Sequence, residues 1–281
     1  MTGSDTRCWL CSADSVVDSV LGDDGYFRCT SCGFVFQPGR GSAEVEAARY
    51  TGDYFDNYSH RETGRGSYDD VPQRKYEAAR RVRFVRRHVG GGTLLEVGAA
   101  SGYFVAASSN SGFDARGIEP SATTAAQARK SGRNVTAGTL AAEATEGRTY
   151  DVVCAWHVLE HLPEPTRAVE DLRSLLSPGG LVFLELPNLA SRMATRAGRH
   201  WAALQAEDHV AHYAPATLRR LLTIGRLEVV TLHTVPFREY LERPRLFGLG
   251  QVLLDTRRAG TPLFRDASRH ELLRVVASRK E

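Results

Sequence analysis

The chain has 281 residues, of which 42% are hydrophobic and 25% charged, and its formal net charge is +3. This composition supports a buried core and excludes disordered, collagen-like and coiled-coil chains. At about 150 residues per domain, the length fits one large domain with a small appendage, or two modest domains. Basic residues are spread along the chain, so a dedicated nucleic-acid-binding face is not expected.

The N-terminal segment predicts a cytoplasmic protein. Residues 1–7 are polar and do not resemble a signal peptide. The longest apolar runs, such as 181–186, are far shorter than the roughly 20 residues of a membrane helix. No membrane partner is therefore expected.

Two Cys-x-x-Cys pairs lie near the N-terminus. They are Cys8 and Cys11, followed by Cys29 and Cys32. Each pair forms a tight knuckle, and two knuckles complete the four-thiolate set that zinc prefers. A redox dithiol or two disulfides are the alternatives, but neither explains two matched knuckles in a cytoplasmic chain. Because thiolates fill every position, we predict a structural Zn²⁺ in a small zinc ribbon whose strands lie near 26–28 and 34–36.

A cluster of Pro, Gly and Ser at 37–42 marks the expected end of the ribbon, which gives a ribbon domain over 1–40. Residues 41–92 are then expected to form an aromatic and helical linker with a lid. Tyr50, Tyr54 and Tyr58 recur at helical spacing and either pack ribbon against domain or face a ligand. The polar, glycine-containing stretch 56–70 has the composition of a lid.

An amphipathic helix is predicted over 73–89. Its apolar positions, which include Tyr76, Ala79 and Val82, are expected to face a core. The arginines between Arg80 and Arg87 are expected to form a solvated face, and an RNA-facing helix is the alternative.

Short apolar runs then alternate with helical stretches. The strand-like runs are 93–97, 114–119, 134–137, 150–155, 181–186, 226–235 and 270–278, and the helical stretches are 103–110, 122–130, 166–176 and 216–224. This alternation predicts a Rossmann-like, doubly wound parallel α/β sheet over 93–281. Residues 236–268 are too long for a turn and are interpreted as an acceptor-side insertion. Ligands of such sheets bind at the carboxyl ends of the strands.

Two strand ends carry ligand-type residues. The first strand runs into a loop of small residues, Gly98 to Gly102, which leads directly into a helix. Its spacing does not match the dinucleotide-binding pattern. The second strand ends at Glu119, where a carboxylate can accept both hydroxyls of a ribose.

The complete set of motifs resembles class I S-adenosylmethionine-dependent methyltransferases. The motifs are Glu96-x-Gly98-x-Ala100-x-Gly102, Glu119, Asp151-Val152-Val153, Val158-Leu159-Glu160-His161, Leu176 to Gly180 and Leu184 to Asn188. The resemblance covers about 93–236 and departs at Ala100, where the family usually has glycine. With its cysteine pairs, the chain is similar to the zinc-ribbon methyltransferases of sugar and natural-product pathways.

The resemblance implies the cofactor residues. Glu96, Gly98, Ala100 and Gly102 would hold the methionine part of S-adenosylmethionine, Glu119 the ribose, and Gly138, Thr139 and Leu140 the adenine, while Ala155, Trp156 and His157 would line the sulfonium and acceptor side. Ordinary packing is the alternative role for Trp156.

Methyl transfer needs an aligned acceptor and, for some acceptors, a base. We predict His209 as the base with Asp208 assisting, because related sugar methyltransferases place an acidic-His pair there, and His161 as a supporting or alternate base. Alternatively, His209 and His212 cap the helix that begins near Pro215, or are metal ligands that lack a third partner in the sequence.

The leading functional hypothesis is methyl transfer to an oxygen or carbon of a small molecule, such as a nucleotide-linked sugar or a natural-product intermediate. An RNA methyltransferase is the second hypothesis, because zinc ribbons and an arginine-rich helix can hold phosphates. A zinc-ribbon interaction protein with an inactive methyltransferase-like domain is the third.

Overall fold

A computed structural model describes residues 7–18, 21–41, 49, 71–236 and 269–280. The predicted aromatic repeat at Tyr50 to Tyr58, the lid at 56–70 and nearly all of the insertion at 236–268 lie outside these residues. No helix in the described part of the chain is long and apolar enough to cross a membrane.

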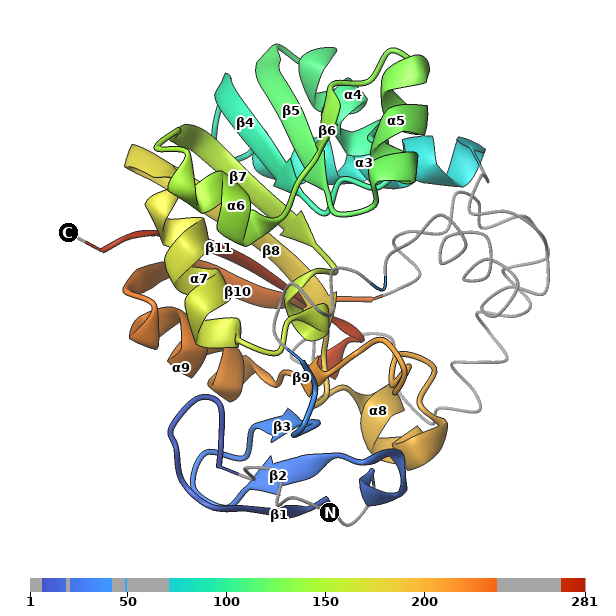
Figure 1. Cartoon of the computed structure of the whole chain (residues 1–281), viewed down its shortest axis with the longest axis vertical. Coiled ribbons are helices and arrows are strands. Elements are labelled where there is room, and N and C mark those ends of the chain that lie inside the picture. Colours follow the sequence, from blue (N-terminus) through green and yellow to red (C-terminus); the bar gives the residue numbers. More distant parts are fainter. Residues whose placement is uncertain (1–6, 19–20, 42–48, 50–70, 237–268, 281) are drawn as a thin grey trace.

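A seven-stranded sheet forms the centre of the larger domain (Figure 1). Its strands are β4 (Gly92–Val97), β5 (Phe113–Glu119), β6 (Val135–Ala137), β7 (Tyr150–Trp156), β8 (Leu176–Pro187), β10 (Leu227–Val235) and β11 (Leu272–Arg279). The spatial order is β10-β11-β8-β7-β4-β5-β6. The chain thus begins in the middle of the sheet and moves to each edge in turn, which confirms the predicted doubly wound arrangement.

The last strand departs from the predicted parallel sheet. β11 pairs antiparallel with both β8 and β10, so it inserts between two strands that run the other way. Apolar runs predict strands but carry no direction, because direction is set by long-range pairing.

Helices cover both faces of this sheet. They are α3 (Val71–Val85), α4 (Tyr103–Ser109) and α5 (Ala122–Lys130) on one face, and α6 (Leu140–Thr145), α7 (Pro165–Ser174) and α9 (Pro215–Ile224) on the other. One apolar cluster joins Val82, Phe104 and Ala125 to the first face, and another joins Val169 and Leu221 to the second. The short helix α6 was not predicted.

The predicted inward face of α3 is partly wrong. Ala79 is exposed and Ala78 is buried in its place. Arg81 is also turned inward, where its guanidinium lies 3.2 Å from the buried Glu185 carboxylate. The basic run is therefore not entirely a solvated face.

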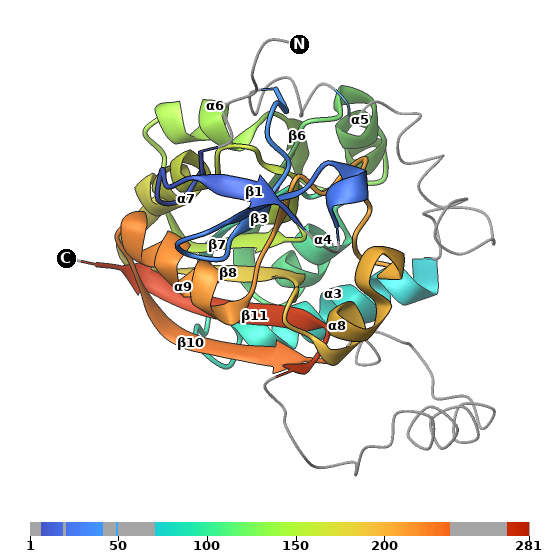
Figure 2. The same cartoon turned by 90° about the horizontal axis from the view of Figure 1, so that it is seen from below.

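The N-terminal ribbon continues into the main domain through a second sheet. This sheet has the order β1-β2-β3-β9 and joins β1 (Ser15–Val17), β2 (Phe27–Cys29) and β3 (Val35–Phe36) to β9 (Ala211–His212). Val35 pairs with His212 and Phe36 with Ala211. In Figures 1 and 2 the ribbon lies at the end of the large sheet toward which β7 and β8 point, beside β9.

The segment between β8 and β9 carries the short helices α8 (Arg192–Ala197) and η3 (Gly198–His200). A small apolar cluster packs Trp201 and Leu204 of this segment against Tyr26 of the ribbon. In the large domain, the short 3-10 helix η2 (Leu159–His161) follows β7. The ribbon, β9 and η2 thus meet at one place.

Candidate active site

The loop after β4 forms one wall of an open pocket, called here the Glu96 cavity. Gly98 and Gly102 have φ of +70° and +72°, a region that favours glycine. Ala100 has φ +46° and occupies the same region with a side chain. A Cβ at Gly102 would lie 2.7 Å from Val135 Cγ2, so close packing also requires a glycine there.

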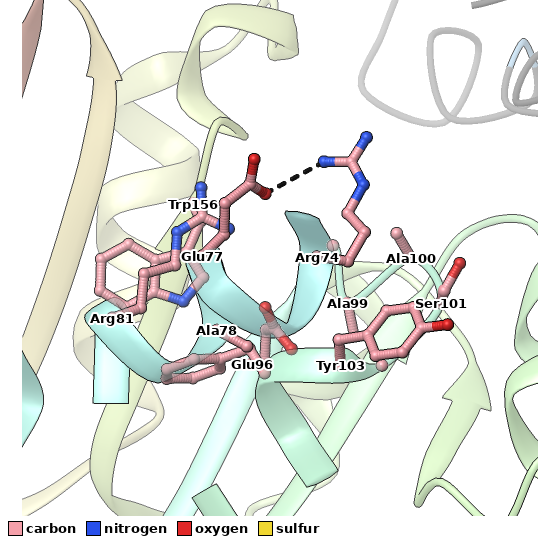
Figure 3. Close-up of a pocket in the computed structure, with 13 residues that line it drawn as sticks. Arg74, Glu77, Ala78, Arg81, Glu96, Ala99, Ala100, Ser101, Tyr103 and Trp156 are labelled. Carbon is pink, nitrogen blue, oxygen red and sulfur yellow. Dashed lines mark hydrogen bonds and ion pairs between the residues drawn. The ribbon is translucent and has the colours of Figure 1, made fainter. Parts of the chain in front are cut away.

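Glu96 lies inside this cavity between Ala78 of α3 and Tyr103, the first residue of α4 (Figure 3). Its side chain is buried, and its Oε2 has no hydrogen-bond partner among the described residues. Burial raises the pKa of Glu96 to about 8. A buried carboxylate oxygen without a partner is costly, and a bound cationic group would satisfy it.

Glu119 at the end of β5 is anchored by two backbone amides. Ala100 N donates to its Oε2 at 2.9 Å, and Ser121 N donates to its Oε1 at 3.0 Å. Burial raises the pKa of this carboxyl, and the two amides act against that shift. Each oxygen keeps a second lone pair, so the fixed carboxylate can still accept the two hydroxyls of a ribose.

Some of the predicted cofactor residues line the cavity, and others do not. Glu96, Gly98, Ala100, Gly102 and Trp156 line it, whereas Glu119, Thr139, Leu140, Ala155 and His157 are not among its lining residues. Thr139 is the N-cap of α6, where its hydroxyl accepts from Ala142 N, and Leu140 begins that helix. Ala155 is buried in β7.

The wall opposite the loop comes from α3, which the sequence did not assign to the site. Arg74, Glu77 and Arg81 lie on it, and Arg74 forms an ion pair with Glu77 at 3.2 Å (Figure 3). The Arg81 guanidinium lies 5.3 Å from the centroid of the Trp156 ring. The spacing of Arg74, Ala78 and Arg81 on one helix face was the available signal.

Trp156 both packs and lines the cavity. Its ring meets Phe104 edge to face at 5.3 Å, and its Nε1 is buried without a partner in the described part of the chain. The two roles considered for this residue are therefore compatible.

His157, directly after β7, is held between two buried carboxylates. Its Nδ1 lies 3.1 Å from Glu160 Oε1, and its Nε2 lies 3.6 Å from Glu185 Oε1. Burial alone would lower the pKa of His157, but the Glu160 carboxylate, which is hydrogen-bonded to the ring, and the nearby Glu185 carboxylate raise it to about 9. The imidazole is therefore cationic at neutral pH and is not suited to act as a base.

A second group of polar side chains lies beyond His157 and is called here the acceptor-side cluster. It consists of Glu160, His161 and His209, each of which offers one ligand-type atom within 4.8 Å of the others. The His161 and His209 ring centroids are 4.7 Å apart. The structure thus brings together two of the three residues predicted to be catalytic.

Backbone carbonyls orient both imidazoles. His161 Nδ1 donates to the Asp208 carbonyl at 3.1 Å, and His209 Nδ1 donates to the Ala203 carbonyl at 2.9 Å. Burial, followed by the charge of His209, lowers the pKa of His161 to about 3, and burial also lowers the pKa of His209. Both rings are therefore neutral at pH 7 with the lone pair on Nε2.

Asp208 contacts the acceptor-side cluster through its backbone. Its backbone carbonyl orients His161, while the Ala203 carbonyl orients His209. The N-cap of α9 is Ala214, and its amide donates to the Thr217 hydroxyl at 2.9 Å. The alternative in which His209 and His212 cap this helix is therefore not supported.

The four N-terminal cysteines converge. The Sγ separations are 3.6 Å for Cys8 and Cys32, 3.4 Å for Cys11 and Cys29, and 3.6 Å for Cys11 and Cys32. A tetrahedral ion bonded to sulfur at about 2.3 Å spaces its ligands roughly 3.8 Å apart. The cluster therefore fits a four-thiolate metal site.

The fold and cavity define a class I methyltransferase, and comparisons with known proteins agree. Residues 72–232 match the family described as "Methyltransferase domain". The chain belongs to this family, whose class I members use S-adenosylmethionine. The match begins within the stretch 41–92 that the sequence assigned to a linker.

Curated relatives include proteins named "Ubiquinone biosynthesis O-methyltransferase". That of Paraburkholderia xenovorans is 36% identical over 36% of this chain and 47% of its own length. That of Burkholderia pseudomallei is 26% identical over 56% of this chain and 73% of its own length. The chain spans about half the length of the first curated relatives it matches.

Solved structures show the same fold. A methyltransferase from Archaeoglobus fulgidus, titled as S-adenosylmethionine-dependent, has a TM-score of 0.57 and 17% identity over 81% of this chain and 100% of its own. A chain from a complex of the Trm112 methyltransferase activator with a methyltransferase of Haloferax volcanii has a TM-score of 0.57 and 18% identity, covering 82% of this chain and 97% of its own.

Proposed function

We propose that this protein transfers a methyl group from S-adenosylmethionine to an oxygen or carbon nucleophile of a small molecule. The observation that carries the proposal is that Trp156 lines the Glu96 cavity while the next residue, His157, contacts Glu160 of the acceptor-side cluster. A cofactor cavity and a neutral histidine pair at the same strand ends are the two parts that methyl transfer to a protic acceptor requires.

The chain's residues fit the cofactor. Glu96 Oε2 would accept from its ammonium group, the loop from Gly98 to Gly102 would border its methionine part, and Glu119 would hold its ribose. Thr139 and Leu140 stay proposed neighbours of the adenine. The bound cofactor supplies a methyl group already activated by a sulfonium.

The acceptor-side cluster would activate the nucleophile. The Nε2 lone pairs of His209 and His161 are the groups suited to interact with an acceptor hydroxyl, and the backbone carbonyls fix both rings in the required orientation. His157 is cationic and would stabilise negative charge on the acceptor side.

The proposal covers hydroxyl-bearing small molecules as a class. The relatives named O-methyltransferases favour an oxygen acceptor. A nucleotide-linked sugar and a natural-product intermediate stay candidate acceptors for the assay. We also propose a structural Zn²⁺ on Cys8, Cys11, Cys29 and Cys32, which the sulfur separations support.

The test is transfer of labelled methyl from S-adenosylmethionine into two pools, low-molecular-weight metabolites with nucleotide sugars added, and total RNA. The proposal expects label in the small molecules, with the Glu119→Ala variant losing at least tenfold in rate. Label confined to RNA would replace it with the second hypothesis, in which the arginines of α3 face phosphates.

A further inference from the structure

The acceptor-side cluster of Glu160, His161 and His209 has the composition of a metal site. It combines two imidazoles and one carboxylate, a donor set that suits first-row divalent ions more than Mg²⁺ or Ca²⁺. It is separate from the four-cysteine cluster, and its residues come from η2 and from the segment that precedes β9.

The hydrogen bonds around the cluster match those of metal-binding histidines. Such histidines donate the proton of one ring nitrogen to a carbonyl or carboxylate and bind the ion with the other. His161 donates to the Asp208 carbonyl and His209 to the Ala203 carbonyl. Since carbonyl oxygens only accept, Nδ1 carries the proton in both neutral rings and Nε2 is the nitrogen that can bind an ion.

Glu160 provides an independent observation. Its side chain is 1% exposed, its Oε1 is held by His157 Nδ1 at 3.1 Å, and its Oε2 is buried without a hydrogen-bond partner in the described ranges. A carboxylate oxygen in this state lacks a proton donor or a cation. The two histidines supply the other ligands that such a cation needs.

We infer that Glu160 Oε2, His161 Nε2 and His209 Nε2 bind a first-row divalent transition-metal ion. A tetrahedral ion with bonds of about 2.0–2.1 Å spaces its ligands roughly 3.3 Å apart, so small rotations close the cluster onto it. Three protein ligands leave a position open for an acceptor oxygen or water. The inference rests on the proposed function and deepens it: with the ion bound, the Nε2 lone pairs contact the ion, and the ion in turn would bind and polarise the acceptor hydroxyl.

Backbone hydrogen bonds hold two of the three proposed ligands, Glu160 and His209, in place. Val210 N donates to the Glu160 carbonyl at 2.8 Å, which ties His209 and its neighbour to η2. Tyr26 of the ribbon donates to the His209 carbonyl at 2.5 Å. The ligands are thus positioned before an ion binds, which lowers the cost of binding.

The experiment adds Co²⁺ to the whole chain after its four cysteines have been loaded with Zn²⁺. We expect one further metal equivalent per chain, without thiolate-to-metal charge-transfer absorption, and with imidazole nitrogen ligation by X-ray absorption spectroscopy. This spectroscopy uses the unaltered protein and does not depend on the folding of a variant. Uptake of no further equivalent, or uptake with sulfur ligands alone, would overturn the inference.

Variants assign the ligands. His161→Ala and His209→Gln should each weaken the second Co²⁺ site by at least tenfold while the Zn²⁺ content stays unchanged. His200→Ala removes an exposed histidine outside the cluster and should leave both sites intact. Equal Co²⁺ affinity in all three variants would count against the assignment.

The two proposals fail separately. Methyl transfer to a small molecule by protein that takes up no Co²⁺ would overturn the metal site and leave the proposed function standing. Nitrogen-ligated Co²⁺ without transfer to any small molecule would support the metal site and count against the proposed function.

Discussion

At the scale of single residues, burial of Glu96 lowers the stability of the folded protein at high pH and provides a carboxylate that can bind a cationic ligand. Burial raises its pKa to about 8 from an ordinary value of 4.5, so the folded protein favours the protonated form. Stability associated with this group is intact below about pH 4.5 and is lost as the pH rises toward about 8. A bound cationic ligand would offset the free-energy cost of keeping the charged Glu96 carboxylate buried.

Glu96→Gln should therefore act in opposite directions on stability and on binding. Without ligand, the variant should melt at a higher temperature than the unaltered protein at about pH 9, with a smaller difference near pH 5. Its affinity for S-adenosylmethionine should fall roughly 10- to 100-fold, since hydrogen bonds to charged groups contribute about 1.5–3 kcal/mol. Thermal melts and calorimetric titration measure the two effects. Unchanged cofactor affinity would remove Glu96 from the site.

The two small residues Ala100 and Gly102 give a matched pair of substitutions. Ala100 has φ +46°, and a non-glycine residue there costs roughly 1–2 kcal/mol, partly offset by the greater freedom of glycine in the unfolded chain. Ala100→Gly should leave the free energy of unfolding unchanged or raise it by up to about 1 kcal/mol. Gly102→Ala should lower it by about 1–3 kcal/mol, because its Cβ would lie 2.7 Å from Val135 Cγ2. Denaturant titrations measure both, and equal losses would contradict this account of the loop.

At the scale of elements, the ribbon and the segment before β9 form one unit. Beyond the pairing of β3 with β9, Gln37 N donates to the Val210 carbonyl at 2.9 Å, and Gln37 Nε2 donates to the Ala206 carbonyl at 3.0 Å. The four-thiolate site therefore supports backbone next to His209. We propose that this cluster holds Zn²⁺, and because small ribbons fold only with their metal, removal of the ion should disturb both parts.

Chelation should remove amide-exchange protection from the ribbon and from residues 204–213 while β4, β5 and β7 keep theirs. Hydrogen exchange followed by mass spectrometry measures this segment by segment. The reference is protein with Zn²⁺ restored after chelation, in which protection should return. Full protection of 204–213 in the chelated protein would show that the ribbon does not support β9, and loss across the large sheet would contradict the sequence-based boundary near Pro38.

The elements also show what a sequence can and cannot predict. β4 through β7 were predicted to within one residue at each end because buried parallel strands are continuous apolar runs. β8 begins at Leu176, five residues before the predicted start at 181, because its first residues include Ser, Pro and two glycines. β9 has only two residues and gains its partner from a strand far away in the chain, so no local pattern indicates it. The inward turn of Arg81 depends on Glu185 of β8, a partner that helix periodicity does not reveal.

At the scale of the whole molecule, the candidate site was predicted unevenly. Motif resemblance placed Glu96 and Glu119 correctly at the ends of β4 and β5, since strand ends of doubly wound sheets face the ligand. The sequence did not predict that Glu160, the third ligand-type residue of the acceptor-side cluster, lies beside His209. Its proximity to His209 arises from the packing of η2 against the segment before β9, which is a tertiary contact.

The central claim is that the crevice at β4 and β5 binds S-adenosylmethionine. Calorimetric titration tests it directly, with the unaltered protein, Glu119→Ala and the control Glu228→Ala, which removes an exposed acid on β10. The account predicts one saturable site of roughly micromolar affinity, weakened at least tenfold by Glu119→Ala and unchanged by Glu228→Ala. Absence of binding, or equal affinity in all three proteins, would contradict the account and favour a methyltransferase-like domain that has lost its cofactor.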